Sequence, residues 1–453
     1  MSVISDFIGN SARENVLAAI AKARENEEFN AVLSLTENRA LERADKVDTG
    51  EINGRLAGVP FIAKDNFLTF DAPTTASSTF LKDFHAPLQA TAIEKLEAEG
   101  AICIGKANLD AFAHGGSTEN SAYGPTKNAV DTERVAGGSS GGSAVSVALG
   151  IVPFALGTDT GGSIRQPASF NGVVGVKPTY GTVSRYGVVA MASSTDTIGV
   201  LSTTIEDAET VMDIISGQDP KDMTTLPDFF TPQTEQGSKK IGLIKEFMDE
   251  GVDPEVKATT EKYVERLRQK GYTVEEVSMS LLKYALAIYY IVVPAEISSN
   301  LGRYDGVRYG ARAETNTLGG MYGLSRDQGF MPENKRRIMI GSYVLSSGYF
   351  DAYYLQAQKA RTLLVNEFNA LFESYDALIG PVAPTPAFKL GENTGDPVKM
   401  YLADIMTVPA SLAGLPAISV PAGKSQSGLP IGVQLIGARK SDSLLMAIAK
   451  DVA

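Results

Sequence analysis

Short apolar runs alternate with amphipathic stretches along most of the chain. Residues 101–107 are mostly apolar, whereas residues 253–271 repeat apolar positions at the spacing of a helix. The apolar runs predict strands at 56–67, 101–107, 153–163, 173–178, 240–247, 272–278, 377–384, 417–423 and 431–437. The amphipathic stretches predict helices at 11–26, 36–47, 91–100, 143–150, 204–217, 253–271 and 441–453.

The order of these elements predicts the fold class. Strands that alternate with helices are typical of an α/β protein whose sheet is covered by helices on both faces. We therefore expect one large domain over residues 1–453, with a mixed, mainly parallel sheet at its core. A mostly helical insertion occupies about 281–372, and a polar break lies at about 217–238.

Composition and charge exclude several classes of protein. The hydrophobic fraction of 43% and the charged fraction of 21% are ordinary for a soluble enzyme. A formal net charge of −12 argues against a chain that binds nucleic acid by itself, because binding to phosphates needs a basic face. Cys103, the single cysteine, lies in an apolar run, so we expect a buried, unreactive thiol in a reducing compartment. Glycines, serines and Pro153 interrupt the longest uncharged apolar run, so no membrane helix is expected.

The stretch 137–167 is the strongest candidate for chemistry, because it has two Gly-Gly-Ser turns on either side of an apolar run. Small residues at helical spacing follow the first turn, so GGSS at 137–140 predicts a helix N-terminus. The second turn ends the buried strand predicted at 153–163, and two glycines before Ser163 let consecutive backbone N–H groups converge on one point. This pattern predicts an oxyanion hole beside a hydroxyl. A flexible linker would not carry the apolar residues between the turns.

Two common motifs match only in part. GAICIGKA, from Gly100 to Ala107, resembles a phosphate-binding loop but lacks the Ser or Thr that would hold magnesium. GGSSG at 137–141 fits the nucleophile elbow of α/β-hydrolases, which requires an acid and then a histidine after the serine. No histidine follows His114, so a serine nucleophile in this chain needs a different base.

Four stretches resemble the amidase signature family: GVPFIAKDNF, ERVAGGSSGGSAVSVALG, ALGTDTGGSIRQPASFNGVVGVKPTYG and AGLPAISVPAG. The resemblance extends from about residue 53 to the end of the chain and implies a catalytic core at 53–200. It implies a Ser–Ser–Lys triad in which Lys64 is the base, Ser139 the bridging serine and Ser163 the nucleophile. The separations of these residues along this chain match the spacing of the family.

The chemistry of this triad depends on the environment of its lysine. An ordinary lysine, with a pKa of about 10.4, is protonated at neutral pH and cannot act as a base, but burial lowers the pKa. A neutral Lys64 would take a proton from Ser139, which would take one from Ser163. Asp159 and Arg165 flank the second turn, and we expect a structural ion pair between them. The expected oxyanion hole consists of four consecutive backbone N–H groups, those of Thr160, Gly161, Gly162 and Ser163.

Further stretches, including SSNLGRYDGVRYG and SSGYFDAYYLQAQ, look like the glutaminase subunits of tRNA-dependent amidotransferases within this family. A glutaminase must recognise an α-carboxylate and an α-ammonium group, so it needs a cation and an anion. The resemblance places the cation at Arg337 and the anion at Asp404. A third contact is expected at Tyr289, with an uncertainty of one position because Tyr290 follows it. The helical insertion at 281–372 would contribute to this glutamine pocket.

The same resemblance implies partners and a location. Glutamine would be the substrate, and the chain would join B and C subunits in a cytoplasmic heterotrimer without contact to a membrane. The B subunit would hold tRNA, ATP and magnesium and would use the released ammonia to amidate a misacylated glutamyl-tRNA. The chain itself is expected to bind no metal or other cofactor.

Two alternative functions are also considered, and one stretch of the sequence differs from the pattern of the family. A free-standing amidase that hydrolyses small amides would use the same triad, whereas a non-catalytic scaffold would not be expected to keep all three triad residues. His114 and Gly115 stand where the family more often has a methionine and another small residue. Lining of the glutamine pocket is one role for His114, and the sequence leaves that role open.

Overall fold

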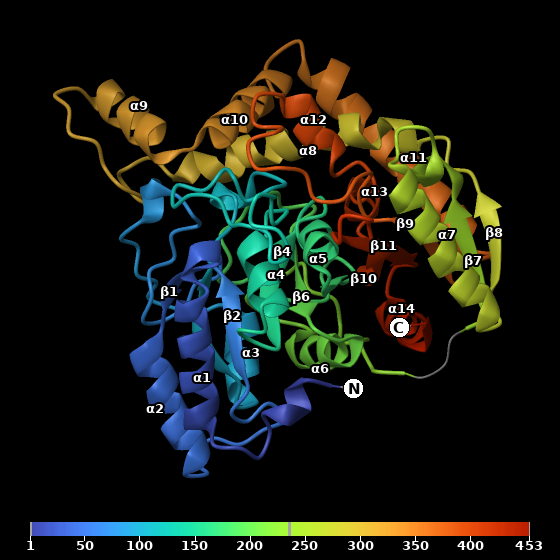
Figure 1. Cartoon of the computed structure of the whole chain (residues 1–453). Coiled ribbons are helices and arrows are strands. Elements are labelled where there is room, and N and C mark those ends of the chain that lie inside the picture. Colours follow the sequence, from blue (N-terminus) through green and yellow to red (C-terminus); the bar gives the residue numbers. More distant parts are fainter. Residues whose placement is uncertain (1, 234–236, 453) are drawn as a thin grey trace.

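One continuous sheet extends through the molecule (Figure 1). The structure is a computed structural model that describes residues 2–233 and 237–452. Within these residues eleven strands follow the order β1-β3-β2-β4-β6-β5-β10-β11-β9-β7-β8. The strands are β1 (Val32–Leu35), β2 (Pro60–Lys64), β3 (Ile102–Ala107), β4 (Phe154–Asp159), β5 (Val174–Lys177), β6 (Thr197–Ser202), β7 (Lys240–Ile244), β8 (Thr273–Val277), β9 (Ala377–Pro381), β10 (Ala417–Lys424) and β11 (Pro430–Gly437). The expected single α/β domain with a mixed sheet is confirmed.

The sheet is not mainly parallel, and this part of the expectation is wrong. Among the described strands, four of the ten strand pairs are parallel and six are antiparallel. The sequence patterns missed β1 and β6, and β6 runs antiparallel to both of its neighbours, β4 and β5. The connection between β10 and β11 spans only residues 425–429, and so short a connection cannot join parallel strands.

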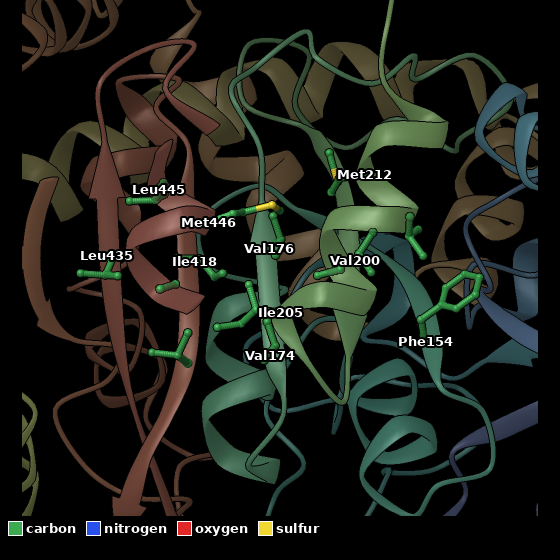
Figure 2. Close-up of a cluster of buried hydrophobic side chains, with 14 of the residues drawn as sticks. Phe154, Val174, Val176, Val200, Ile205, Met212, Ile418, Leu435, Leu445 and Met446 are labelled. Atoms are coloured by element: carbon green, nitrogen blue, oxygen red, sulfur yellow. The ribbon is translucent and has the colours of Figure 1, made fainter. Parts of the chain in front are cut away.

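Helices cover both faces of the sheet, as expected. Successive residues of a strand point to opposite faces, so Phe154 and Leu156 of β4 belong to one hydrophobic cluster and Ala155 to another. The first cluster lies beneath α3, α6 and α14, and Figure 2 shows part of it. The second lies beneath α1, α2, α4 and α5. The helices on the two faces are α1 (Ala12–Glu25), α2 (Glu37–Asp48), α3 (Thr91–Ala98), α4 (Gly141–Ala148), α5 (Arg165–Asn171), α6 (Ile205–Ile215), α7 (Pro254–Gln269) and α14 (Asp442–Val452).

The segment expected to be mostly helical contains α8 (Leu282–Asn300), α9 (Leu318–Gly329), α10 (Pro332–Val344) and α11 (Gln356–Phe372). These helices lie along one side of the molecule in Figure 1, near the short helices α12 (Pro397–Leu402) and α13 (Val408–Leu412). By length and composition, the stretch 282–303 would suffice to cross a membrane, with a mean hydropathy of 1.2. Half of this stretch is buried, and α8 packs against α10, α11 and α13, which is typical of a core helix.

We predict that truncation of a core side chain on the central sheet destabilises the protein. Leu435 of β11 is fully buried in the cluster of Figure 2, so Leu435→Ala removes packed methyl groups and leaves a cavity. Such a change lowers the free energy of unfolding by about 2–5 kcal/mol. Urea-induced unfolding followed by circular dichroism measures the effect, and Leu363→Ala on the exposed face of α11 is the control. Equal unfolding midpoints for the two variants would contradict the assigned core.

Candidate active site

Lys64 is the last residue of β2, and its side chain is completely buried. Its Nζ lies 2.8 Å from Ser139 Oγ, 2.9 Å from Thr158 Oγ1 and 3.4 Å from the carbonyl oxygen of Thr158. The structure thus brings together Lys64 and Ser139, which are 75 residues apart in the sequence. This contact is the geometry expected of a base and the serine that it deprotonates.

The topology of the sheet explains why these residues meet. β2 lies between β3 and β4 and is parallel to both, so the three strands end at the same edge of the sheet. Lys106 of β3 forms a fully buried ion pair with Asp65, with Nζ 2.9 Å from Oδ1, directly after Lys64. The edge formed by the carboxyl ends of parallel strands is a common place for active sites. Lys106 thus has a structural partner, and the region around it is a buried strand rather than a phosphate-binding loop.

Ser139 lies in the loop that precedes α4, as the GGSS pattern predicts. The peptide bond between Gly138 and Ser139 is cis. Gly138 donates its N–H to Gln166 Oε1 at 2.9 Å, and Thr118 Oγ1 donates to the carbonyl oxygen of Gly137 at 2.7 Å. A Cβ at Gly138 would lie 2.2 Å from the carboxylate of Asp110, so only glycine fits there. The loop that presents Ser139 is thereby held on both sides.

Ser163 is the last residue of the second Gly-Gly-Ser turn, which follows β4, and 8% of its surface is exposed. The N–H of Ser140 donates to the carbonyl oxygen of Ser163 at 3.0 Å, so the two Gly-Gly-Ser turns are adjacent. Within residues 2–233 and 237–452, no hydrogen bond forms from the Ser163 hydroxyl. The structure therefore places the backbone of Ser163 against Ser140, the residue after Ser139, and leaves the Ser163 hydroxyl without a hydrogen bond among these residues.

Asp159 and Arg165 form the expected structural ion pair. Both side chains are fully buried, and Arg165 donates from Nε and from a terminal nitrogen to the two carboxylate oxygens, at 3.0 Å each. Burial alone would raise the pKa of Asp159, but the Arg165 guanidinium holds it below the ordinary value. Asp159 also accepts the N–H of Gly162 at 2.8 Å. The expected oxyanion hole of four N–H donors is therefore wrong for one of them, because the N–H of Gly162 already donates to Asp159.

Burial determines the protonation of Lys64. Removal from water lowers its pKa to about 7, whereas the carboxylates of Asp110, Asp159 and Asp196 act in the opposite direction. A lysine with this pKa is partly neutral at physiological pH and can accept a proton.

Arg337 of α10 is buried, and its side chain lines a pocket together with Asp110, Gly116 and Tyr401. Its Nε donates to Glu333 Oε1 at 2.8 Å, and its guanidinium lies over the ring of Tyr401. Glu333 is a partner that the sequence analysis did not consider. Because one edge of the guanidinium is taken by Glu333, the remaining N–H groups are the ones available to an anion in the pocket.

Asp404 lies directly behind Gly116, a residue that lines the same pocket. A Cβ at Gly116 would lie 3.1 Å from its Oδ2, and Gln166 Nε2 donates to its Oδ1 at 3.2 Å. Burial raises the pKa of Asp404 to about 8, against the opposing effect of Arg337. A carboxyl group in this state gains a favourable partner when a cation enters. Gln166, which also accepts from Gly138, joins Asp404 to the loop of Ser139 and was missed by the sequence analysis.

The two adjacent tyrosines of α8 have different surroundings. A Cβ at Gly161 would lie 2.7 Å from the hydroxyl of Tyr289, so this hydroxyl rests on the turn before Ser163. The hydroxyl of Tyr290 instead lies 3.5 Å from a terminal nitrogen of Arg337, and its ring stacks on Tyr401. Tyr289 therefore faces the catalytic turn, and Tyr290 supports the arginine.

His114 and Cys103 are both buried. The Nδ1 of His114 lies 2.6 Å from the carbonyl oxygen of Phe112, while its Nε2 has no partner in the described part of the chain. Burial, reinforced by nearby Arg337, lowers the pKa of His114 to about 3, so the ring is neutral. Burial raises the pKa of the Cys103 thiol to about 11, in keeping with the expected unreactive core residue.

Comparison with known proteins places this site in a family. The family model described as Amidase matches residues 14–446, which is nearly the whole chain. The chain belongs to the amidase family. The resemblance to this family that the sequence motifs indicated is therefore confirmed.

Within the amidase family, the chain is 51% identical to the A subunit of glutamyl-tRNA(Gln) amidotransferase from Cyanothece sp. over 452 residues, covering 97% of this chain and 93% of that protein. Its structure is similar to that of the A subunit of glutamyl-tRNA(Gln) amidotransferase from Thermotoga maritima, with 39% identity, a TM-score of 0.84 and coverage of 100% and 94%. A bacterial aryl acylamidase of the amidase signature family is 27% identical, also with a TM-score of 0.84, and coverage is 99% and 94%.

We predict that Lys64 lowers the stability of this amidase-family protein in a pH-dependent way. Its pKa falls from 10.5 in an exposed lysine to about 7 in the fold, so between these values the unfolded chain binds more protons and stability rises with pH. Lys64→Met removes this effect and is expected to unfold at a higher temperature than the wild type at about pH 7, with a smaller difference at about pH 10.

Thermal unfolding at the two pH values measures this difference. Lys424→Met, at an exposed lysine, is the control and should change the midpoint little at either pH. A Lys64→Met difference that stays constant with pH would show that Lys64 is fully protonated in the folded protein.

Proposed function

We propose that this chain is the glutaminase component of a tRNA-dependent amidotransferase. It hydrolyses glutamine to glutamate and ammonia, and the ammonia is used by a partner protein with ATP to convert Glu-tRNA(Gln) to Gln-tRNA(Gln). The observation that carries the proposal is the presence of Arg337 in the wall of one pocket and of Asp404 directly behind Gly116 of the same wall. Arg337 supplies the positive charge for the α-carboxylate of free glutamine, and Asp404 becomes its negative counterpart when the α-ammonium group enters. The names of the relatives agree with this assignment.

The reaction begins with a proton transfer. Neutral Lys64 takes a proton from Ser139 as Ser139 takes the proton of Ser163, whose oxygen attacks the carboxamide carbon. The N–H groups of Thr160, Gly161 and Ser163 are the remaining candidates to stabilise the oxyanion. The relay then runs in reverse, protonates the departing amine and releases ammonia.

Water completes the cycle. Ser139 and Lys64 take a proton from a water molecule, which attacks the ester at Ser163, and glutamate leaves with the regenerated hydroxyl. Within each half of the cycle the relay returns the proton that it takes, to the departing amine in the first half and to Ser163 in the second, so we propose that the chain needs no metal or redox cofactor of its own. The partner protein supplies the ATP-dependent step with magnesium.

We further propose that the chain acts in a cytoplasmic heterotrimer with B and C subunits. The B subunit binds the tRNA, because the net charge of −12 on this chain disfavours contact with phosphates. Arg337 and Asp404 favour this function over a free-standing amidase, because an uncharged amide has no group for either charge.

A reconstitution assay tests the proposed function. Wild-type chain with B and C subunits is expected to form Gln-tRNA(Gln) from Glu-tRNA(Gln), glutamine and ATP. Ser163→Ala should fold normally and form no product with glutamine, but should still form product when ammonium chloride replaces glutamine, because the partner site is intact. A wild-type chain that forms no Gln-tRNA(Gln) and hydrolyses uncharged amides faster than glutamine would be a free-standing amidase.

We predict that Arg337→Ala and Asp404→Asn each raise KM for glutamine. Each change leaves one charge of the substrate without its partner, at a cost of roughly 2–4 kcal/mol in a desolvated site, which is about 30- to 1,000-fold in KM. Steady-state glutaminase kinetics measure the effect. Lys335→Ala on the same helix is the control, because Lys335 pairs with Asp327 outside the pocket.

Hydrolysis of butyramide provides the second control for these variants. Butyramide lacks both charged groups, so its rate of hydrolysis should be nearly the same in the wild type and the two variants. An equal loss with glutamine and butyramide would show that Arg337 and Asp404 support the fold rather than bind the substrate.

A further inference from the structure

Three oxygen atoms surround the nitrogen of the Lys64 side chain. One is the hydroxyl of Ser139, and the other two, the hydroxyl and the carbonyl oxygen, belong to Thr158 of β4. The Thr158 side chain is buried, with 4% of its surface exposed, and the triad described above does not include it. Its two contacts account for two of the three positions around the base.

The number of hydrogens on Lys64 makes these positions important. A neutral amine has two N–H groups and one lone pair, and it acts as a base only if the lone pair faces the proton that it will take. The carbonyl oxygen of Thr158 can only accept, so it takes one N–H. The second N–H and the lone pair are then divided between the hydroxyls of Thr158 and Ser139. Catalysis requires Thr158 to accept and Ser139 to donate.

We propose that Thr158 is a positioning residue for the base, an inference that rests on the proposed role of Lys64. Its hydroxyl and carbonyl oxygens accept the two N–H groups of neutral Lys64, and the lone pair consequently points at Ser139 Oγ. Both oxygens belong to one residue of a central strand, so their separation is fixed by the backbone of β4 and a single rotamer.

Asn66 holds that rotamer. Its Nδ2 donates to Thr158 Oγ1 at 3.2 Å, and its side chain is buried. An amide nitrogen can only donate, so this bond requires Thr158 Oγ1 to act as an acceptor on that side. Asn66 comes two residues after Lys64 in the same strand-to-loop segment, so one short stretch of chain carries the base and the group that orients its support.

Thr158 and Asn66 lie away from the substrate pocket. Both line a different pocket, together with Asp196 and Arg185, and neither lines the pocket of Arg337. A change of the Thr158 hydroxyl should therefore alter the rate of proton transfer and leave the binding of glutamine unchanged. This separates a positioning role from a role in substrate recognition.

The pH dependence separates the positioning role from a purely structural one. Protonated Lys64 donates all three of its hydrogens, and hydrogen bonds from an ammonium group are stronger than those from an amine. Loss of the Thr158 hydroxyl therefore destabilises the protonated form more than the neutral form, which lowers the pKa of Lys64 further. The rise of kcat with pH should move to lower pH while its maximum falls.

The experiment compares Thr158→Val, which keeps the shape but loses the hydroxyl, with Thr158→Ser, which keeps the hydroxyl. Thr158→Val is expected to lower the maximal kcat by about 10- to 100-fold, with KM unchanged within about twofold. The midpoint of its pH profile should fall by about one unit. Thr158→Ser should restore most of the kcat and the wild-type midpoint.

Thr260→Val is the matched control, because Thr260 of α7 is also buried and, among the described residues, its hydroxyl bonds only the carbonyl oxygen of Val256 in its own helix. A folded Thr158→Val with wild-type kcat and pH profile would overturn the proposal. So would a loss of kcat without a pH shift that Thr158→Ser fails to restore. If Thr158→Val does not fold, Asn66→Ala decides, with lower kcat at unchanged KM in support and wild-type kcat against.

The substrate keeps this test separate from the proposed function. Proton transfer to Lys64 does not depend on which amide is cleaved, so the same variants are measured on butyramide if the wild type does not hydrolyse glutamine. Failure of the glutaminase proposal then leaves the inference on Thr158 open to a direct result. An active Lys64→Arg variant would overturn both proposals, because arginine stays protonated in proteins and Lys64 would then not be the base.

Discussion

The burial of one lysine at the end of a central strand is the constraint on which the site depends. An ammonium group loses its hydration when β2 is covered on both sides, and this loss makes the amine available near neutral pH. The arrangement works because β2 is flanked by two parallel strands, so oxygen atoms from β4 replace part of the lost hydration. Elsewhere in the chain an exposed lysine would remain protonated and inert.

A second buried group keeps the catalytic turn in shape. Arg165 pairs with the Asp159 carboxylate, which accepts the N–H groups of Gly162 and Ile164. These bonds fix the backbone of the turn around the carboxylate. Arg165 extends the network to Gln434 of β11, which ties the turn to the far half of the sheet. Ser163 therefore stands on a loop whose geometry is determined by the core and not by its own flexible glycines.

The sequence indicates the candidate catalytic residues more readily than the residues that hold them in place. The resemblance to a known family supplied Lys64, Ser139 and Ser163 as a set, whereas the composition of the second glycine-rich turn predicted only converging N–H groups beside a hydroxyl. Gln166 and Thr158 could not be assigned in this way, because their partners lie far away in the sequence and any polar residue satisfies the same local pattern. Glu333 is different, because it stands four residues before Arg337 on one helix, a local signal that the sequence analysis did not use. The same limit applies to the sheet. The runs that form β1 and β6 are short, and only their long-range pairing distinguishes them from loops.

Gln166 links two parts of the candidate site that lie far apart in the sequence. Its amide uses the oxygen for Gly138 and the nitrogen for Asp404, so a single side chain connects the loop of Ser139 with the carboxyl group beside the pocket. Glutamate at this position could accept from Gly138 but would repel Asp404, and methionine could serve neither. A substitution at position 404 therefore also changes the hydrogen bonding of the side chain that holds Gly138. The effects of substitutions at positions 166 and 404 on stability are thus expected to be non-additive, because the two side chains share one hydrogen bond.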